Sequence, residues 1–288
     1  MPDGDVEGCL GNAMTFIAII ISDDQRDENN QDEKLMGMTI DIFCRIPSIV
    51  NKHWIANERN RSDPRKMGLA VVEEYGLSGI SVVDGCCRLL AIGSVIARMK
   101  AGNDATYDWY VEECIRWETH SYAIRERNMK DVSIQELLEH RYVEGACSLF
   151  LSMSVVFSGV PVSHEAIYHP VHETLKRKAS LHLCLLNDIT SYDREVDSVE
   201  GLQNFVEYQR VFCSLTHNLE DALNKTIKQC NEIMDEFIVA WKEMQTKSED
   251  MKFLAKNASR MMLGHIPWAL TAPRYNRDEF LISRIALQ

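Results

Sequence analysis

Three aspartates stand close together near the amino terminus, in the segment Asp23-Asp24-Gln25-Arg26-Asp27. Asp23 and Asp27 are four residues apart, about one turn of an α-helix, so a helix would place both carboxylates on one face. Carboxylate oxygens are hard ligands that Mg²⁺ prefers, and Mg²⁺ completes its coordination shell with water and substrate phosphate. The spacing therefore predicts a magnesium site, and a solvated acidic helix end is the alternative interpretation of the same pattern.

A second polar set lies between Asn187 and Glu195, directly after the apolar run LHLCLL. Asn187, Ser191 and Glu195 stand at positions i, i+4 and i+8, which stacks an amide, a hydroxyl and a carboxylate along one helix face. Because the preceding run is apolar, this face is expected to point inward, where unpaired polar groups cost free energy. A bound metal ion would satisfy all three oxygens, and an ordinary network of buried hydrogen bonds would do so too.

Two further features supply donors suited to an anion. Arg141 stands midway along an otherwise apolar helical segment, HRYVEGACSLF. A buried arginine needs an anionic partner, and a structural salt bridge is its usual explanation. Near the carboxyl end, Arg274 and Tyr275 place a guanidinium beside a phenol, and both groups can donate to a phosphate oxygen. Neither feature alone specifies a ligand.

The elements that would carry these residues are helices. The 288 residues include only seven prolines, and none falls within residues 65–160 or 171–266. Long proline-free spans favour long helices, because an interior proline removes a backbone donor and clashes with the preceding turn. The chain also has only 14 glycines, which argues against a turn-rich sandwich or barrel. We therefore predict an all-α protein with one domain over residues 1–288.

Apolar periodicity and capping residues place the expected helices along the chain. Ser133 and Glu136 form a capping-box signature, and Asp104 is a candidate N-cap. The segment 82–100 is almost wholly apolar and suits a helix in the middle of the protein. Residues 1–15 are polar and glycine-bearing, and we expect them to be poorly ordered. The other expected helices span residues 35–50, 66–75, 104–128, 133–157, 172–196, 217–246 and 249–265, with the end of a helix at 16–28, a loop at 29–34 and a short element near 164–169.

Composition narrows the class of protein and its location. With 31 Lys and Arg against 43 Asp and Glu, the net charge is −12, which argues against nucleic acid as a partner because duplex binding needs a basic face. The nine cysteines are scattered without a CxxC pair, as expected for reduced thiols inside a cell. The amino terminus lacks the pattern of a signal peptide, and the apolar run Phe16–Ile21 is too short to cross a bilayer. We expect a cytoplasmic protein without stable membrane insertion.

Taken together, the motifs resemble those of the class I terpene synthases in their single-domain microbial form. That family carries an aspartate-rich DDxxD motif, an NDxxSxxxE triad and an Arg-Tyr pair near the carboxyl terminus, and all three occur here in that order. The family's diphosphate-sensing arginine precedes the triad asparagine by 46 residues, which is also the separation between Arg141 and Asn187. A linker residue and a small effector residue follow that arginine by three and four positions, where this chain has Glu144 and Gly145.

The resemblance implies a fold, a reaction and a set of ligands. The fold would be an α-helical bundle around a central apolar cavity, and the reaction would be ionisation of an acyclic prenyl diphosphate followed by cyclisation of the carbocation to a terpene. Farnesyl diphosphate is the first choice of substrate and geranylgeranyl diphosphate the second. Three Mg²⁺ ions are expected, with Mn²⁺ as the alternative metal, and a homodimer stays open. In this scheme the metal ligands are Asp23, Asp24, Asp27, Asn187, Ser191 and Glu195, the diphosphate contacts are Arg141, Arg194, Arg274 and Tyr275, the carbonyl at Gly145 turns to the substrate, and Trp268 lines the cavity with Phe16 and Phe150 as further aromatic candidates.

Two alternatives stay open beside this interpretation. Family members usually carry one or two helices before the aspartate-rich motif, whereas only 22 residues precede Asp23, so we expect the first one or two helices to be missing. A truncated, non-catalytic relative that binds a partner or serves as a scaffold is therefore the first alternative. A chain-elongating prenyl transferase handles the same diphosphates, but it would carry a second aspartate-rich motif in place of Asn187–Glu195.

Overall fold

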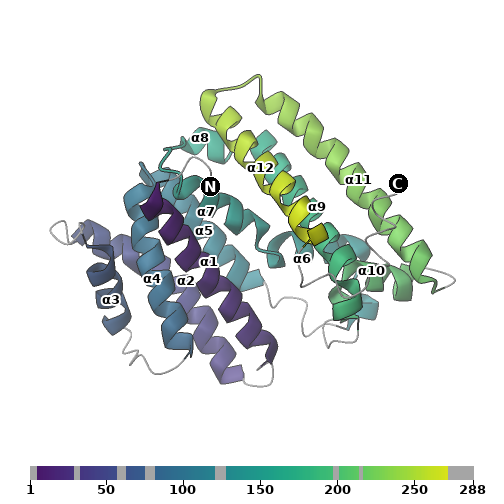
Figure 1. Cartoon of the computed structure of the whole chain (residues 1–288), viewed down its shortest axis with the longest axis horizontal. Helices are drawn as coiled ribbons and strands as arrows, with labels where there is room; N and C mark the ends of the chain where they lie inside the picture. The colour runs from purple at the N-terminus through teal and green to yellow at the C-terminus, as the bar shows by residue number, and fades with distance from the viewer. Residues whose placement is uncertain are drawn as a thin grey trace. The chain divides into compact units, whose positions relative to one another are not determined.

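The computed structural model describes the chain as two compact units, drawn in Figure 1. The first unit comprises Met1–His120 and Leu149–Ile167, and the second comprises Ser121–Ser148 and Tyr168–Gln288. Every regular element among the described residues is a helix, which confirms the all-α prediction, and none of these helices combines the length and hydrophobicity that crossing a bilayer requires. The single domain over residues 1–288 stays a prediction.

The structure describes most of the chain. The described residues are 5–28, 33–56, 63–74, 82–120, 128–196, 201–213 and 217–271. Within these ranges, nothing is described of the side chains of residues 20–28, 33–44, 82–84, 118, 201, 270 and 271.

Helix α4 (Val82–Lys100) forms the middle of the first unit, as its nearly continuous apolar sequence predicts. Helices α1, α2 and α3 all pack against α4, and α5 packs against α2 and α8 (Figure 1). The buried side chains of α4 include Leu90, Val95 and Ile96. The other helices of this unit are α1 (Val6–Glu28), α2 (Glu33–Ala56), α3 (Pro64–Glu74), α5 (Asp104–His120), α8 (His164–Ile167) and most of α7 (Cys147–Val156).

Two glycines let α1 approach α4 closely. A methyl group added at Gly93 of α4 would lie 2.3 Å from the hydroxyl oxygen of Thr15 on α1, and one added at Gly11 would lie 2.6 Å from a methyl carbon of Ile96. Both distances are far below van der Waals contact. The buried Thr15 hydroxyl donates to the Gly11 carbonyl oxygen at 3.0 Å, which fixes it in the interface. The packing of α1 on α4 therefore depends on positions that have no side chain.

Helix α1 begins at Val6, so residues 6–15 are helical although we expected poor order there. Asp5 caps the helix, because its Oδ1 accepts a hydrogen bond from the Gly8 N–H at 2.8 Å. Lys100, at the end of α4, donates to Asp5 Oδ2 at 2.6 Å, and this hydrogen bond lowers the pKa of Asp5. Asp5 and Lys100 are 95 positions apart, so no local pattern reveals the contact that orders the start of α1.

Helix α5 departs from expectation at both ends. Its N-cap is Asn103 and not Asp104, because Asn103 Oδ1 accepts from the Thr106 N–H at 2.9 Å and Asp104 is the first helical residue. The described helix ends at His120, residues 121–127 lie outside the described residues, and Asn128 is not helical. Asn128 instead caps a separate 3₁₀ turn that spans the next three residues.

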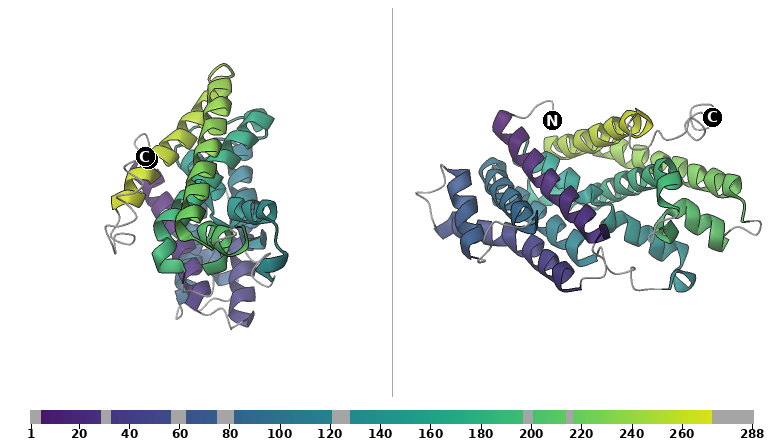
Figure 2. Two further views of the ribbon diagram at one scale, coloured as in Figure 1. Left: turned by 90° about the vertical axis from the view of Figure 1, so that its right-hand side faces the viewer. Right: turned by 60° about the horizontal axis from the view of Figure 1, so that its bottom comes forward.

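Helix α9 (Pro170–Glu195) is the central helix of the second unit. Helices α6, α10, α11 and α12 pack against it, and α11 and α12 run alongside each other in Figures 1 and 2. One buried cluster joins Leu138 of α6, Leu185 of α9 and Phe205 of α10. The other elements are α6 (Ile134–Glu144), α10 (Phe205–Tyr208), which continues as a π-helical turn (Gln209–Cys213), α11 (Leu219–Met244) and α12 (Glu249–Thr271).

The capping box at the start of α6 is confirmed. The Ser133 hydroxyl accepts from the Glu136 N–H at 3.2 Å, and the Ser133 N–H donates to Glu136 Oε2 at 2.8 Å. The helix does not run to residue 157 as expected but breaks after Glu144, and α7 begins at Cys147. The predicted helices at 35–50, 66–75, 82–100, 172–196, 217–246 and 249–265 correspond to α2, α3, α4, α9, α11 and α12, and most of the loop expected at 29–34 lies outside the described residues.

We predict that Gly93→Ala destabilises the chain although alanine is the better helix former, because the added methyl meets Thr15 at 2.3 Å. The expected loss is about 1–3 kcal/mol in the free energy of unfolding, measured by urea denaturation. Gly85→Ala on the same helix is the matched control. Nothing lies within 4 Å of its added methyl, so stability should stay constant or rise by up to about 1 kcal/mol. Equal stability of the two variants would contradict the close packing of α1 on α4.

Candidate functional site

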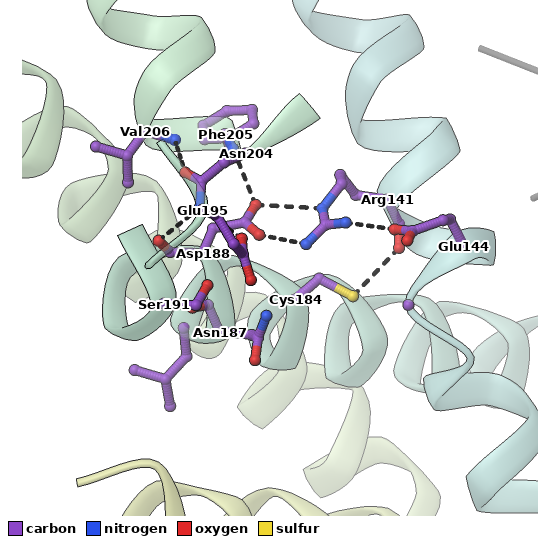
Figure 3. A network of polar contacts seen from close by, with 12 residues as sticks. Arg141, Glu144, Cys184, Asn187, Asp188, Ser191, Glu195, Asn204, Phe205 and Val206 are labelled. Atoms are coloured by element: carbon purple, nitrogen blue, oxygen red, sulfur yellow. Dashed lines mark hydrogen bonds and ion pairs between the residues drawn. The ribbon is translucent and has the colours of Figure 1, made fainter. Parts of the chain in front are cut away.

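A buried ion pair joins α6 to α9 in the second unit. Arg141 on α6 donates from Nε to Asp188 Oδ2 at 3.2 Å, and its Nη2 pairs with Asp188 Oδ1 (Figure 3). Its Nη1 pairs with Glu144, three residues further along α6. Arg141 is 9% exposed and Asp188 has no exposed surface, so both charges are held away from water. The prediction that Arg141 needs an anion is confirmed for the described structure, and protein carboxylates supply it.

Burial and charge act against each other in this pair. Burial raises the pKa of Asp188 to about 7, and the Arg141 guanidinium opposes this shift by stabilising the carboxylate. Desolvation also acts against the charge of Arg141, but the carboxylates of Asp188 and Glu144 outweigh it and hold the arginine pKa well above its ordinary value. Each charge is therefore tolerated inside the unit because the other is present.

The start of α10 completes the surroundings of Asp188. The Phe205 N–H donates to Asp188 Oδ2 at 3.0 Å, so the carboxylate accepts two hydrogen bonds from Arg141 and one from the backbone. Asn204 Nδ2 donates to the Asp188 carbonyl oxygen at 2.9 Å and to Glu195 Oε2 at 3.1 Å. Asn204 thus links the ion pair to the last turn of α9.

The three predicted triad residues lie on consecutive turns of α9 (Figure 3). The buried Ser191 hydroxyl donates to the Asn187 backbone carbonyl at 2.7 Å, which leaves the lone pairs of its oxygen for another partner. Glu195 is half-buried and accepts from Arg194 through Oε1 at 2.8 Å. An amide, a hydroxyl and a carboxylate oxygen are hard donors, so the set fits Mg²⁺. No three His, Cys, Asp or Glu side chains form a metal-binding cluster anywhere in the described part of the chain.

The break between α6 and α7 follows the turn that carries Arg141. A methyl group added at Gly145 would lie 2.2 Å from Cys184 Sγ on α9, so α9 leaves no room for a side chain. Cys184 Sγ also donates to the Arg141 carbonyl oxygen at 3.2 Å. The residue in the left-handed conformation is Ala146, with φ of 54°, whereas Gly145 has φ of −64°. Glycine at position 145 is therefore required for the close approach of α9 and not for the backbone turn.

The remaining predicted ligands are only partly described. The backbone of α1 passes through Asp23, Asp24 and Asp27, so the aspartate-rich motif is helical as predicted. The side chains of these three residues lie outside the description, and Arg274 and Tyr275 lie outside the described residues altogether. Their roles stay predictions.

Three aromatic residues are candidates for an apolar wall. Phe16 and Phe150, both in the first unit, contact each other with ring centroids 5.2 Å apart, and Phe16 is 45% exposed. Trp268 on α12 has its ring centroid 5.5 Å from that of His265 and is 48% exposed. Phe16 and Trp268 therefore keep accessible aromatic surface that an apolar ligand can contact, and neither belongs to the fully buried core.

The sequence predicts no role for Asp188, Asn204 or Cys184, although Asp188 is the aspartate of the NDxxSxxxE motif. A search for the acid that pairs with Arg141 would have reached Asp188, because it directly follows the apolar run of α9. Asn204 and Cys184 give no such signal. Their contacts arise only where α10 and α6 meet α9.

Known proteins resemble this chain in sequence and in fold. A family model described as "Terpene synthase family 2, C-terminal metal binding" matches residues 98–236, which include Arg141 and the segment Asn187–Glu195. (+)-Eremophilene synthase of Sorangium cellulosum (strain So ce56) is 23% identical over 180 residues, which cover 61% of this chain and 52% of that protein. Conidiogenone synthase of Penicillium roqueforti (strain FM164) is 26% identical over 171 residues, which cover 57% of this chain and 23% of that protein. The chain thus spans about half the length of the first relative and about a quarter of the second.

Several solved structures are similar over nearly the whole chain, among them that of a cucumene synthase variant, whose match covers 96% of this chain and 84% of that one with a TM-score of 0.66 at 13% identity. Another is that of 2-methylisoborneol synthase from Streptomyces coelicolor A3(2) in complex with Mg²⁺ and geranyl-S-thiolodiphosphate. The TM-score is 0.72 at 14% sequence identity, and the match covers 97% of this chain and 82% of that one. At this identity the likeness concerns the fold.

We predict that Asp188→Ala destabilises the chain by about 3–5 kcal/mol, because it leaves the buried Arg141 guanidinium without its bidentate partner. Urea unfolding of the full chain measures the loss. The double variant Arg141→Met with Asp188→Leu should recover most of it, since apolar side chains can replace a buried ion pair. A double variant as unstable as Asp188→Ala would show that the loss does not come from the unpaired charge.

We also predict that Gly145→Ala lowers stability by about 1–3 kcal/mol, because the added methyl overlaps with Cys184 Sγ. Cys184→Ala removes that sulfur, and the Cβ of residue 184 lies at an acceptable 3.7 Å. The double variant Gly145→Ala with Cys184→Ala should therefore lose less free energy of unfolding than the sum of the two single losses. The expected difference is about 1 kcal/mol or more. Strictly additive losses, measured by the same unfolding assay, would contradict the contact.

Proposed function

We propose that the chain, whose residues 98–236 match a terpene synthase family model and whose described helices have the all-α fold of the class I enzymes, ionises an acyclic prenyl diphosphate in a Mg²⁺-dependent reaction. Diphosphate would leave, and the allylic cation would cyclise to a terpene hydrocarbon or alcohol. The observation that carries the proposal is one network in the second unit that holds both Arg141 and the Asn187–Glu195 segment.

The oxygen donors of α9 support the metal part of the proposal. Asn187, Ser191 and Glu195 would hold one Mg²⁺ ion, and the aspartate-rich motif of α1 would hold the others of the three expected. Bound Mg²⁺ neutralises the charge that develops on a leaving diphosphate. The match of residues 98–236 to a metal-binding terpene synthase model supports a divalent metal at Asn187–Glu195 independently of the geometry.

The way Arg141 is held supports a contact with diphosphate. Its described hydrogen bonds use three of the five N–H donors of a guanidinium, which leaves one on each terminal nitrogen for a phosphate oxygen. Since Asp188 fixes the fork, little side-chain entropy is lost when an anion binds. Arg194 and the Arg274–Tyr275 pair would add further donors to the diphosphate.

The relatives support the class of substrate. The similar structure of 2-methylisoborneol synthase contains Mg²⁺ and geranyl-S-thiolodiphosphate, which joins a prenyl group to a diphosphate. We propose farnesyl diphosphate as the first substrate to test and geranylgeranyl diphosphate as the second. The accessible face of Trp268 would stabilise a carbocation by cation–π attraction.

The test incubates the purified full chain with C10, C15, C20 and C25 prenyl diphosphates, in Mg²⁺ or in EDTA. With at least one substrate we expect a cyclic product, detected by gas chromatography–mass spectrometry, and equimolar release of diphosphate. Both are expected in the presence of Mg²⁺ and not in EDTA. A longer prenyl diphosphate formed on addition of isopentenyl diphosphate would identify a chain-elongating transferase instead. No diphosphate release with any substrate would overturn the proposal and favour the non-catalytic alternative.

Two variants on α9 assign the activity to the triad. Asn187→Ala is expected to reduce turnover about 100-fold or more by removing a metal ligand, with helicity unchanged by circular dichroism. Thr190→Ala is the matched control, because the Thr190 hydroxyl only bonds back to the Leu186 and Asn187 carbonyls of its own helix. Wild-type turnover in Asn187→Ala would mean that the triad is structural.

A further inference from the structure

Asn204 uses all of its side-chain hydrogen-bonding groups between α10 and α9. Its Oδ1 accepts from the Val206 N–H at 3.0 Å, which caps α10. Its Nδ2 donates to the Asp188 carbonyl oxygen at 2.9 Å and to Glu195 Oε2 at 3.1 Å (Figure 3). The residue is 3% exposed, so water competes little for these groups.

Only an amide satisfies this set of partners. The Asn204 side chain faces one N–H donor and two oxygen acceptors, so its surroundings fix which end is oxygen and which is nitrogen. Serine or aspartate would cap α10 as well as asparagine does. Neither serine nor aspartate would place two N–H donors toward α9. The need for an asparagine at position 204 therefore comes from the contacts with α9 and not from capping.

Building on the function proposed above, we propose that Asn204 is a positioning residue that holds the Glu195 carboxylate in the orientation needed to bind the metal ion. Glu195 is the last residue of α9, where a helix restrains its side chains least. Asn204 restrains Oε2, and Arg194 restrains Oε1 at 2.8 Å. Partners that orient a metal-binding carboxylate in this way are typical of metal sites, and their loss weakens metal binding.

The same amide couples that carboxylate to the ion pair. Asn204 Nδ2 also holds the Asp188 backbone, and the next residue, Phe205, holds the Asp188 carboxylate. A displacement of the start of α10 would therefore disturb Glu195 and the partner of Arg141 together. Asn204 connects the metal-binding end of α9 with the arginine proposed to contact diphosphate.

The test compares Asn204→Ser, which keeps a capping oxygen and removes Nδ2, with Asn204→Ala, which removes both. The probe is Mn²⁺ with inorganic diphosphate, and electron paramagnetic resonance measures its affinity for the full chain without turnover. Both variants are expected to bind Mn²⁺ about 10–100-fold more weakly than the wild type. Asn218→Ser is the matched control with unchanged affinity expected, because Asn218 caps α11 through the Glu220 N–H at 2.8 Å on the exposed surface.

Wild-type Mn²⁺ affinity in Asn204→Ser, or a loss confined to Asn204→Ala, would overturn the proposal and leave Asn204 as a cap. A wild-type chain that binds no Mn²⁺ with diphosphate would instead overturn the proposed function, and this inference with it, so the two failures are distinguishable. Circular dichroism and unfolding midpoints establish that each variant is folded. Asn204→Thr, a second neutral cap, takes the place of Asn204→Ser if that variant unfolds.

Discussion

The buried pair of Arg141 and Asp188 is the interaction on which the arrangement of the second unit depends. Moving a guanidinium or a carboxylate out of water costs several kcal/mol for each ion, so neither is stable there without the other. A bidentate fork tolerates little displacement, and the pair therefore fixes α6 relative to α9. The Phe205 N–H adds a third donor to the same carboxylate and includes α10 in the constraint. One carboxylate thus holds three helices together.

The pair also sets the rotation of α9 about its own axis. Asp188 directly follows Asn187, and one residue turns an α-helix by about 100°, so the triad and the ion pair occupy neighbouring faces. Turning the triad away from its present direction would pull Asp188 out of the fork of Arg141. The ion pair on one face of α9 therefore orients the predicted metal ligands on the neighbouring face of the same helix. This explains why the asparagine and the aspartate of the NDxxSxxxE motif are adjacent in a single helix.

The features that could be predicted from the sequence are local ones. The capping box at Ser133 and the apolar run of α4 are readable within a few residues, and both are confirmed. The start of α1 depends on Lys100, a partner 95 positions away, and periodicity carries no such information. Gly145 was expected as the small effector residue that the resemblance implies, but its structural requirement is the space that α9 leaves. The role of Asn204 needs α9 and α10 in place together, so spacing alone could not reveal it.

The pairing that stabilises Arg141 also bears on why a metal would be needed. The described network sets two guanidiniums against three carboxylates: Arg141 and Arg194 against Asp188, Glu144 and Glu195. It carries no surplus positive charge, and like charges at 4 Å near a protein surface repel by about 4 kcal/mol, so these residues alone would not attract a diphosphate. A divalent ion on the triad would shift the balance by two charges and convert the acidic end of α9 into an anion site. The net charge of −12 points the same way, because bound cations offset the repulsion between an acidic chain and an anionic substrate.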